Sequence, residues 1–180
     1  MCEYSDVYFV DSRTATAGEA ILVREAVRLR EQGLPAAEIA AALEQLVPRI
    51  CILAVVDSLK HLHKGGRLPA AVAIVGGALG IKPVLSLQGG ALGLADKARG
   101  RPGAFVAMFK QLDQLGGVDP DYGYSLLYSD DKNVAAPIHR YLHSNLHLTG
   151  GHVTQTGAVI GTHIGPGAAG ICFVRGQAQG

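Results

Sequence analysis

The chain has 180 residues, of which 48% are hydrophobic and 17% charged, and its formal net charge is +1. Its length suits one medium-sized domain, or one domain with part of another, and its composition is ordinary for a globular protein with a sizeable core. The near-neutral charge gives no electrostatic case for a nucleic-acid partner.

The cysteines and the hydropathy pattern predict where the protein works. Cys2, Cys51 and Cys172 lie far apart with no CxxC spacing, as expected for reduced thiols in a cytoplasmic protein. The N-terminus is polar and no apolar run reaches about 18 residues, so neither a signal peptide nor an integral-membrane segment is expected. The sequence therefore predicts a cytoplasmic location.

The first part of the chain has the order strand, helix, helix, strand. The apolar run 7–10 predicts a buried strand, and residues 18–32 predict an amphipathic helix that stops at Gly33. A second helix is expected to begin at Pro35, and residues 51–56 form an apolar strand pattern. This order is typical of an α/β fold.

The chain changes character after Asp57. Residues 58–64 predict a short helix, and residues 69–78 predict a helix that is apolar all round, with small side chains that leave room for an apolar ligand. Strands at 82–88 and 91–97 are expected to form a hairpin. The remaining predicted elements are a helix over 101–115, a strand over 122–128, a helix over 133–143 and a strand over 170–175.

Residues 161–170 (GTHIGPGAAG) place one histidine among hydroxyl-bearing and glycine residues. The glycines argue against the interior of a regular helix or strand. They also allow backbone amides to approach an acidic or phosphorylated head group, beside an imidazole that titrates near neutral pH. A tight turn with an incidental histidine is the alternative interpretation.

Four short motifs follow one another along the chain. They are DSRTATAG at 11–18, VDSL with KGGRL between 56 and 68, LGIKPVL with KARG between 79 and 100, and GTHIGPG at 161–167. In this order and spacing they resemble the DegV family over nearly the whole chain.

The resemblance implies an α/β protein that encloses one long-chain fatty acid. The family's best-understood members are the fatty-acid-binding subunits of bacterial fatty acid kinase. They present the acyl carboxylate to a separate ATP-binding kinase subunit, which forms the acyl phosphate. The resemblance therefore implies a non-enzymatic carrier with a fatty acid ligand and no cofactor.

The resemblance also implies a domain division. Residues 1–50 correspond to the tail of an N-terminal α/β domain, and residues 51–180 to a C-terminal DegV-type domain with a mixed sheet and packed helices. Complete members have roughly a hundred further residues at the N-terminal side, a little under a common domain size. We therefore expect a truncated form, with a companion chain or a dimer covering apolar surface near residues 11–18.

A fatty acid needs a dry slot, because each buried methylene contributes about 0.8 kcal/mol. The predicted tail contacts are the apolar residues Val72, Ile74, Val75, Leu79, Ile81, Phe105, Met108 and Phe109. Plain core packing is the alternative for each of them.

The carboxylate needs hydrogen-bond donors at the mouth of that slot. The predicted head-group contacts are His163, Thr162, Gly165, Gly167, Arg67 and Arg99. The two arginines suit a carboxylate or phosphate, and exposed arginines or structural ion pairs are the alternative. Ser12 and Thr16 could line the cleft, although capping and turn formation also explain them.

Three other interpretations stay open. His139 and His143 share one face of a predicted helix, but no further ligand at a recognisable spacing completes a metal site, so a solvated helix face is favoured. A small acyl hydrolase or transferase would use His163 as base, although no G-x-S-x-G segment supplies a nucleophile. A truncated remnant without full binding activity is the third.

Overall fold

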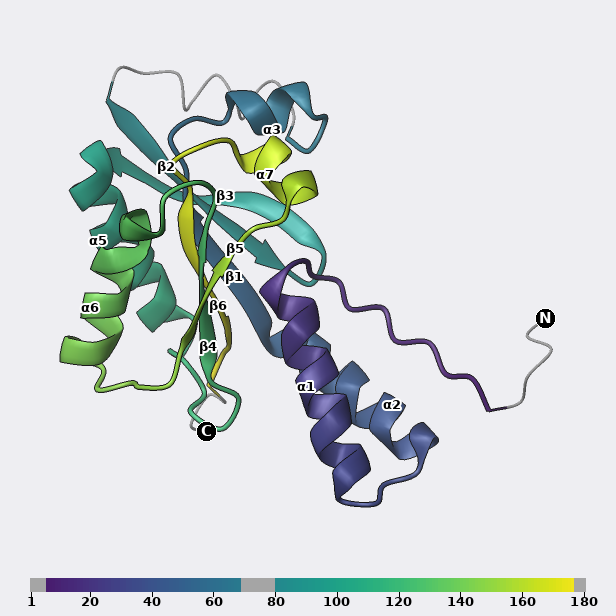
Figure 1. Cartoon of the computed structure of the whole chain (residues 1–180). Helices are drawn as coiled ribbons and strands as arrows, with labels where there is room; N and C mark the ends of the chain where they lie inside the picture. The colour runs from purple at the N-terminus through teal and green to yellow at the C-terminus, as the bar shows by residue number, and fades with distance from the viewer. Residues whose placement is uncertain (1–5, 69–79, 177–180) are drawn as a thin grey trace.

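The computed structural model describes residues 6–68 and 80–176, and its centre is a mixed sheet of six strands in the order β3-β2-β1-β6-β4-β5 (Figure 1). The strands are β1 (Ile50–Val55), β2 (Ile81–Gln88), β3 (Ala91–Arg99), β4 (Tyr124–Tyr128), β5 (His152–Gln155) and β6 (Ala169–Val174). The β4–β5 pair is parallel and the other four pairs are antiparallel. The predicted α/β fold with a mixed sheet is confirmed.

Helices cover both faces of the sheet (Figure 1). One face carries α5 (Gly100–Gln114) and α6 (Ala136–Asn145). The other carries α1 (Ala17–Glu31), α2 (Ala36–Leu46), α3 (Lys60–Lys64) and α7 (Ala158–Ile164). Short 3-10 turns, η1 (Val47–Arg49) and η2 (Lys132–Ala135), precede β1 and α6.

The central strand β1 is apolar throughout because both of its faces are covered. Cys51, Leu53 and Val55 point toward α5 and α6, whereas Ile50 and Ile52 belong to the cluster beneath α1 and α2. This alternation places two separate apolar clusters on the two sides of one sheet.

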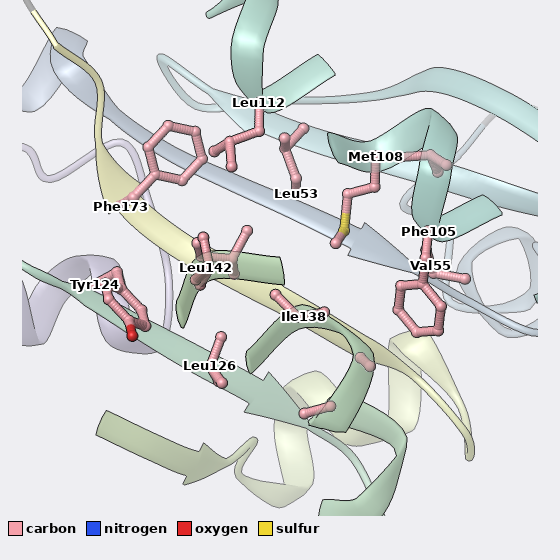
Figure 2. Close-up of a cluster of buried hydrophobic side chains, with 14 of the residues drawn as sticks. Leu53, Val55, Phe105, Met108, Leu112, Tyr124, Leu126, Ile138, Leu142 and Phe173 are labelled. Atoms are coloured by element: carbon pink, nitrogen blue, oxygen red, sulfur yellow. The ribbon is translucent and has the colours of Figure 1, made fainter. Parts of the chain in front are cut away.

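The larger cluster lies between the sheet and the α5–α6 pair. Figure 2 shows Met108 and Leu112 of α5 and Leu142 of α6 meeting Leu53 and Phe173 of the sheet. All five side chains are buried. This cluster therefore fixes α5 and α6 to the sheet.

The helical hairpin of α1 and α2 follows the predicted bounds closely. Gly33, at φ +86°, turns the chain between the two helices, and Pro35 precedes the first residue of α2. The hairpin packs on β1 and β6, since Leu43 and Leu46 share a cluster with Cys172 and Val174. The domain boundary expected at residue 50 stays a prediction.

The strand predicted at residues 7–10 is not formed. This segment has no regular secondary structure, and the side chains of Val7 and Phe9 are 48% and 75% exposed. A strand needs a neighbouring strand to bond its backbone, and none lies beside residues 7–10 in the part of the chain described. The prediction was wrong because apolar content alone does not supply that neighbour.

The expectation of irregular backbone across residues 161–170 holds only for the turn at 165–168 and was wrong for the rest. Residues up to Ile164 belong to α7, and β6 begins at Ala169. The amide of Gly161 donates to Gly157 O at 2.9 Å, as in a helix, and Gly165 ends the helix at φ +75°. Strand β5 and most of α7 were not predicted, and the helix predicted at 69–78 lies outside the described residues.

Candidate functional site

An apolar cavity of about 180 Å³ lies on the sheet face that carries α1, α3 and α7. Small and aliphatic residues on or next to five neighbouring strands, β3, β2, β1, β6 and β4, form its floor, and the helices and the segment before α1 form its walls. The floor consists of Ile52, Ala54, Leu85, Leu87, Leu92, Leu127, Ala168, Ala169 and Gly170. The walls consist of Ala15, Thr16, Leu62, Arg67, Tyr128, Thr156, Ile160, His163 and Ile164.

Two polar atoms in the cavity wall lack a hydrogen-bond partner. Nδ1 of His163 and Oγ1 of Thr16 are both buried and unpartnered within the described part of the chain. A buried polar group normally has a partner, and leaving it without one costs about 1–3 kcal/mol. Both residues line the cavity, so these two buried atoms hold unused hydrogen-bonding capacity directly beside it.

The position of His163 depends on the end of α3. Helices α3 and α7 pack against each other, and the His163 ring lies over Gly65, which follows α3. A Cβ atom on Gly65 would stand 2.2 Å from Nδ1 of His163. A Cβ atom on Gly165 would similarly meet the His61 ring at 2.5 Å. Glycine at both positions lets the two segments approach closely enough to hold the imidazole at the cavity wall.

The turn between α7 and β6 is fixed by groups that follow β4. The Gly167 amide donates to the Asp130 carboxylate at 2.8 Å, and the Ala168 amide donates to Ser129 Oγ at 3.0 Å. The hydrogen bond from Gly167 is the main reason that the pKa of Asp130 lies below its usual value. The backbone that follows His163 is thus tied to the end of a central strand.

A charged cluster stands beside the same turn. Asp57, which follows β1, accepts hydrogen bonds from Lys82 Nζ and Arg101 Nη1, each at 2.9 Å. Burial by itself would raise the pKa of Asp57, but the hydrogen bonds and charges of Lys82 and Arg101 together outweigh it, so this pKa is lowered. A Cβ atom on Gly167 would lie 2.5 Å from Oδ2 of Asp57.

The structure brings two of the predicted head-group residues, His163 and Arg67, to one cavity. The other polar groups already have partners within the chain: the Thr162 hydroxyl donates to Ala158 O at 2.8 Å, and the Gly165 amide donates to Gly161 O at 2.9 Å. The Gly167 amide is bound to Asp130, as described above. Arg99 is exposed before α5 and does not line the cavity.

The four predicted tail residues that the structure describes do not line this cavity. Phe105 and Met108 are buried in the cluster on the opposite sheet face (Figure 2), and the Phe109 ring stacks on Tyr141. Ile81 is partly buried on β2 and does not line the cavity. The other four predicted tail residues, Val72, Ile74, Val75 and Leu79, lie outside the described residues.

The aliphatic floor of the cavity was not predicted from the sequence. Ile52 and Ala54 on β1, and Leu85 and Leu87 on β2, are two apart, so each pair points to one face of the sheet. That alternation could have identified these four residues once β1 was known to be covered on both faces. Ile160 was not predicted because the helix that carries it, α7, was not predicted.

The remaining titratable groups have ordinary structural explanations. His139 and His143 are exposed on α6 with their rings stacked, and the described residues contain no group of three metal-ligating side chains. Cys51 and Cys172 are buried free thiols, and burial raises the pKa of Cys172 to about 12.

No helix among the described residues has the length and apolarity needed to cross a bilayer.

A family model described as an uncharacterised protein of the DegV family matches residues 1–176. The chain belongs to the DegV family. A DegV domain-containing protein of Caldanaerobacter subterraneus subsp. tengcongensis is 34% identical over 173 residues, which are 96% of this chain and 62% of that relative. The chain thus spans a little over three fifths of this DegV relative.

Solved DegV structures have the same fold. A solved structure of fatty acid binding by a DegV family protein from Thermus thermophilus superposes with a TM-score of 0.79 at 30% identity, over 93% of this chain and 61% of that one. The Streptococcus pneumoniae fatty acid kinase B3 protein, loaded with linoleic acid, superposes with a TM-score of 0.82 at 21% identity, over 94% of this chain and 60% of that one. At 21% identity, the similarity to the second structure is evidence for the fold alone.

Proposed function

We propose that this DegV family chain binds a long-chain fatty acid, with part of the tail in the cavity described above and the carboxylate beside His163. The observation that carries the proposal is an aliphatic cavity whose wall holds the buried, unpartnered Nδ1 of His163. Support comes from the solved structure of fatty acid binding by the T. thermophilus relative.

The size of the cavity limits what it holds. An engineered apolar cavity of about 150 Å³ takes one benzene. A cavity of about 180 Å³ therefore accommodates a segment of an acyl chain rather than its full length. About six buried methylenes would contribute about 5 kcal/mol before ordering costs. The described cavity thus supplies a substantial part of the affinity, and the polar wall sets the orientation of the chain.

The head group would be bound by two donors from neighbouring segments. A protonated imidazole of His163 makes a charge-assisted hydrogen bond to a carboxylate. Arg67 uses Nη1 to donate to Gly65 O at 2.9 Å, which leaves its other guanidinium N–H groups for a ligand. Both residues are next to Gly65, so the closely packed α3–α7 contact would also set the spacing of the two donors.

We further propose that the chain is a cytoplasmic carrier that presents the bound carboxylate to a separate ATP-binding kinase subunit. Membership of the DegV family supports this role, because the family's best-understood members work in that way. Arg99 is exposed and could contact an acidic surface of the kinase. No cofactor is needed for such a role, since the kinase subunit supplies ATP. The same proposal includes the domain division, in which residues 1–50 are the tail of an N-terminal α/β domain and residues 51–180 are the lipid-binding domain.

Native mass spectrometry of the purified chain tests the ligand. We expect a long-chain fatty acid to co-purify and to be lost on mild denaturation. Absence of any acyl ligand, together with esterase turnover that His163→Ala removes, would instead indicate an acyl hydrolase. If the chain shows neither ligand nor turnover, it is a remnant without full binding activity.

A second experiment separates head-group recognition from tail binding. In His163→Ala, kinase-dependent phosphorylation of the bound acid should fall more than fatty acid affinity, because the tail contacts remain. His147→Asn is the control, since His147 is an exposed histidine that does not line the cavity, and asparagine tolerates its positive φ of 53°. Equal losses in the two assays for His163→Ala would contradict the proposed orientation of the ligand.

A further inference from the structure

Strand β5 forms an open edge of the sheet. It is outermost in the strand order and pairs with β4 alone, in parallel (Figure 1). All four of its residues are exposed, and within residues 6–68 and 80–176 no strand lies on its outer side. Its sequence, HVTQ, contains neither lysine nor proline, the residues that commonly protect an edge from further pairing.

The register shows which backbone groups of β5 are unused. The amide of Thr156, just after the strand, donates to Tyr128 O at 2.8 Å. Residues of a parallel ladder alternate between pointing both backbone groups toward one neighbour and both away from it. Thr154 therefore faces β4, whereas Val153 and Gln155 direct their N–H and C=O groups outward. A second strand would find two donors and two acceptors there.

A cationic groove runs beside this edge, between β5 and α6. Its volume is about 580 Å³, and it is lined by Leu126, Lys132, Asn133, Ala135, Ala136, His139, Arg140, His143, Ser144 and Val153. Among the residues that the structure describes, no aspartate or glutamate lines it. Lys132 and Arg140 form no ion pair within the described part of the chain. The Asp131 carboxylate, at one end of η2, accepts a hydrogen bond from the Asn133 amide.

We propose that the open edge of β5 and the cationic groove together bind an extended, acidic segment of a partner protein by strand addition. The outward groups of Val153 and Gln155 would pair with the backbone of that segment, and its acidic side chains, two residues apart, would reach into the groove. The charges select this partner, because a basic segment would be repelled by Lys132 and Arg140.

The proposed surface is independent of the fatty acid cavity. The groove lies beside α6, on the α5–α6 side of the sheet, whereas the cavity lies beneath α3 and α7 on the other side. Both ligands can therefore be bound at once. A second copy of this chain fits the groove poorly, because pairing two β5 edges side by side would bring two cationic grooves together.

A blocked synthetic peptide that alternates glutamate and valine tests the proposal, with a peptide alternating lysine and valine as its counterpart. We expect the glutamate peptide to bind, to bind more weakly as salt is raised, and to slow hydrogen exchange at the amides of Val153 and Gln155. Equal binding of the lysine peptide, or no protection of these two amides, would overturn the proposal.

Two variants locate the contact. Val153→Pro removes one outward N–H without removing a hydrogen bond to β4, and it should abolish peptide binding, whereas Val153→Thr keeps the N–H and should retain it. If Val153→Pro does not fold, the double variant Lys132→Glu, Arg140→Glu changes only exposed side chains and should reverse the preference between the peptides. If the double variant keeps the preference for the glutamate peptide, the proposal of an acidic partner is overturned. Self-association of the chain that Val153→Pro removes would overturn it as well.

Discussion

Nδ1 of His163 lies so close to the backbone of Gly65 that a methyl group on Gly65 would stand 2.2 Å from the nitrogen. Gly65 has φ −78° and ψ 1°, which other residues also adopt, so its backbone conformation does not require glycine. Glycine is required at this position because α3 packs closely on α7. This contact connects a short helix with the imidazole at the wall of the fatty acid cavity.

Gly65→Ala should therefore displace the His163 ring and weaken recognition of the carboxylate. Because the tail contacts are untouched, we expect fatty acid affinity to fall by less than kinase-dependent phosphorylation, as for His163→Ala. Gly161→Ala is the matched control: Gly161 is in the same helix as His163, and a Cβ there meets nothing within 4 Å. The control should keep binding and stabilise α7 by up to about 1 kcal/mol. Full activity in Gly65→Ala would show that the ring position is not critical.

The arrangement of the two sheet faces explains what the sequence could and could not predict. The apolar strand β1 and the helix α5 were identified from the sequence, because burial leaves a periodic pattern of apolar residues. The sequence did not say on which face each stripe packs, and so Phe105 and Met108 were assigned to the ligand although they lie across the sheet from His163. That choice depends on strand order, which local patterns do not encode.

The position of His163 was only partly predictable. Its chemistry and its glycine-rich surroundings singled it out, and it does line the cavity. Its place in the last turn of α7 was missed, because α7 has seven residues and a glycine at its centre, too short and too interrupted for a clear helical period. The pairing with Gly65 joins segments almost a hundred residues apart and required the fold.

Filling the cavity should block the ligand and leave the fold intact. Ala54→Leu places a larger aliphatic side chain in the floor of the cavity, so we expect fatty acid binding to fall sharply while the ligand-free chain is as stable as before or slightly more so. Isothermal titration with a long-chain fatty acid and thermal unfolding of the ligand-free protein measure the two effects.

Met108→Ala provides the opposite pattern. Met108 is fully buried in the cluster beneath α5, so its truncation should lower the free energy of unfolding by about 2–5 kcal/mol. Fatty acid affinity of the folded fraction should be unchanged, since this side chain lies across the sheet from the cavity. A large loss of affinity in Met108→Ala, with none in Ala54→Leu, would place the tail on the α5–α6 face.

The ion pairs of Asp57 with Lys82 and Arg101 should make stability depend on pH below neutrality. The pKa of Asp57 is lowered in the folded protein, so its stabilising contribution is complete above the unfolded-state value of about 3.9 and is lost as the pH falls from there through the lower folded-state pKa. Asp57→Asn should therefore destabilise the chain at neutral pH. The expected loss is at most about 1 kcal/mol, because the Asp57 side chain is 44% exposed and solvent screens both pairs.

The difference in stability between the wild-type chain and Asp57→Asn should shrink as the pH falls below about 4, since the wild-type carboxyl is then protonated as well. Urea unfolding at a series of pH values measures this difference. Asp121→Asn is the control, because Asp121 is exposed and its side chain forms no ion pair among the described residues. A destabilisation by Asp57→Asn that stays constant down to pH values well below the unfolded pKa would mean that the charge of Asp57 is not the source of its stabilising contribution.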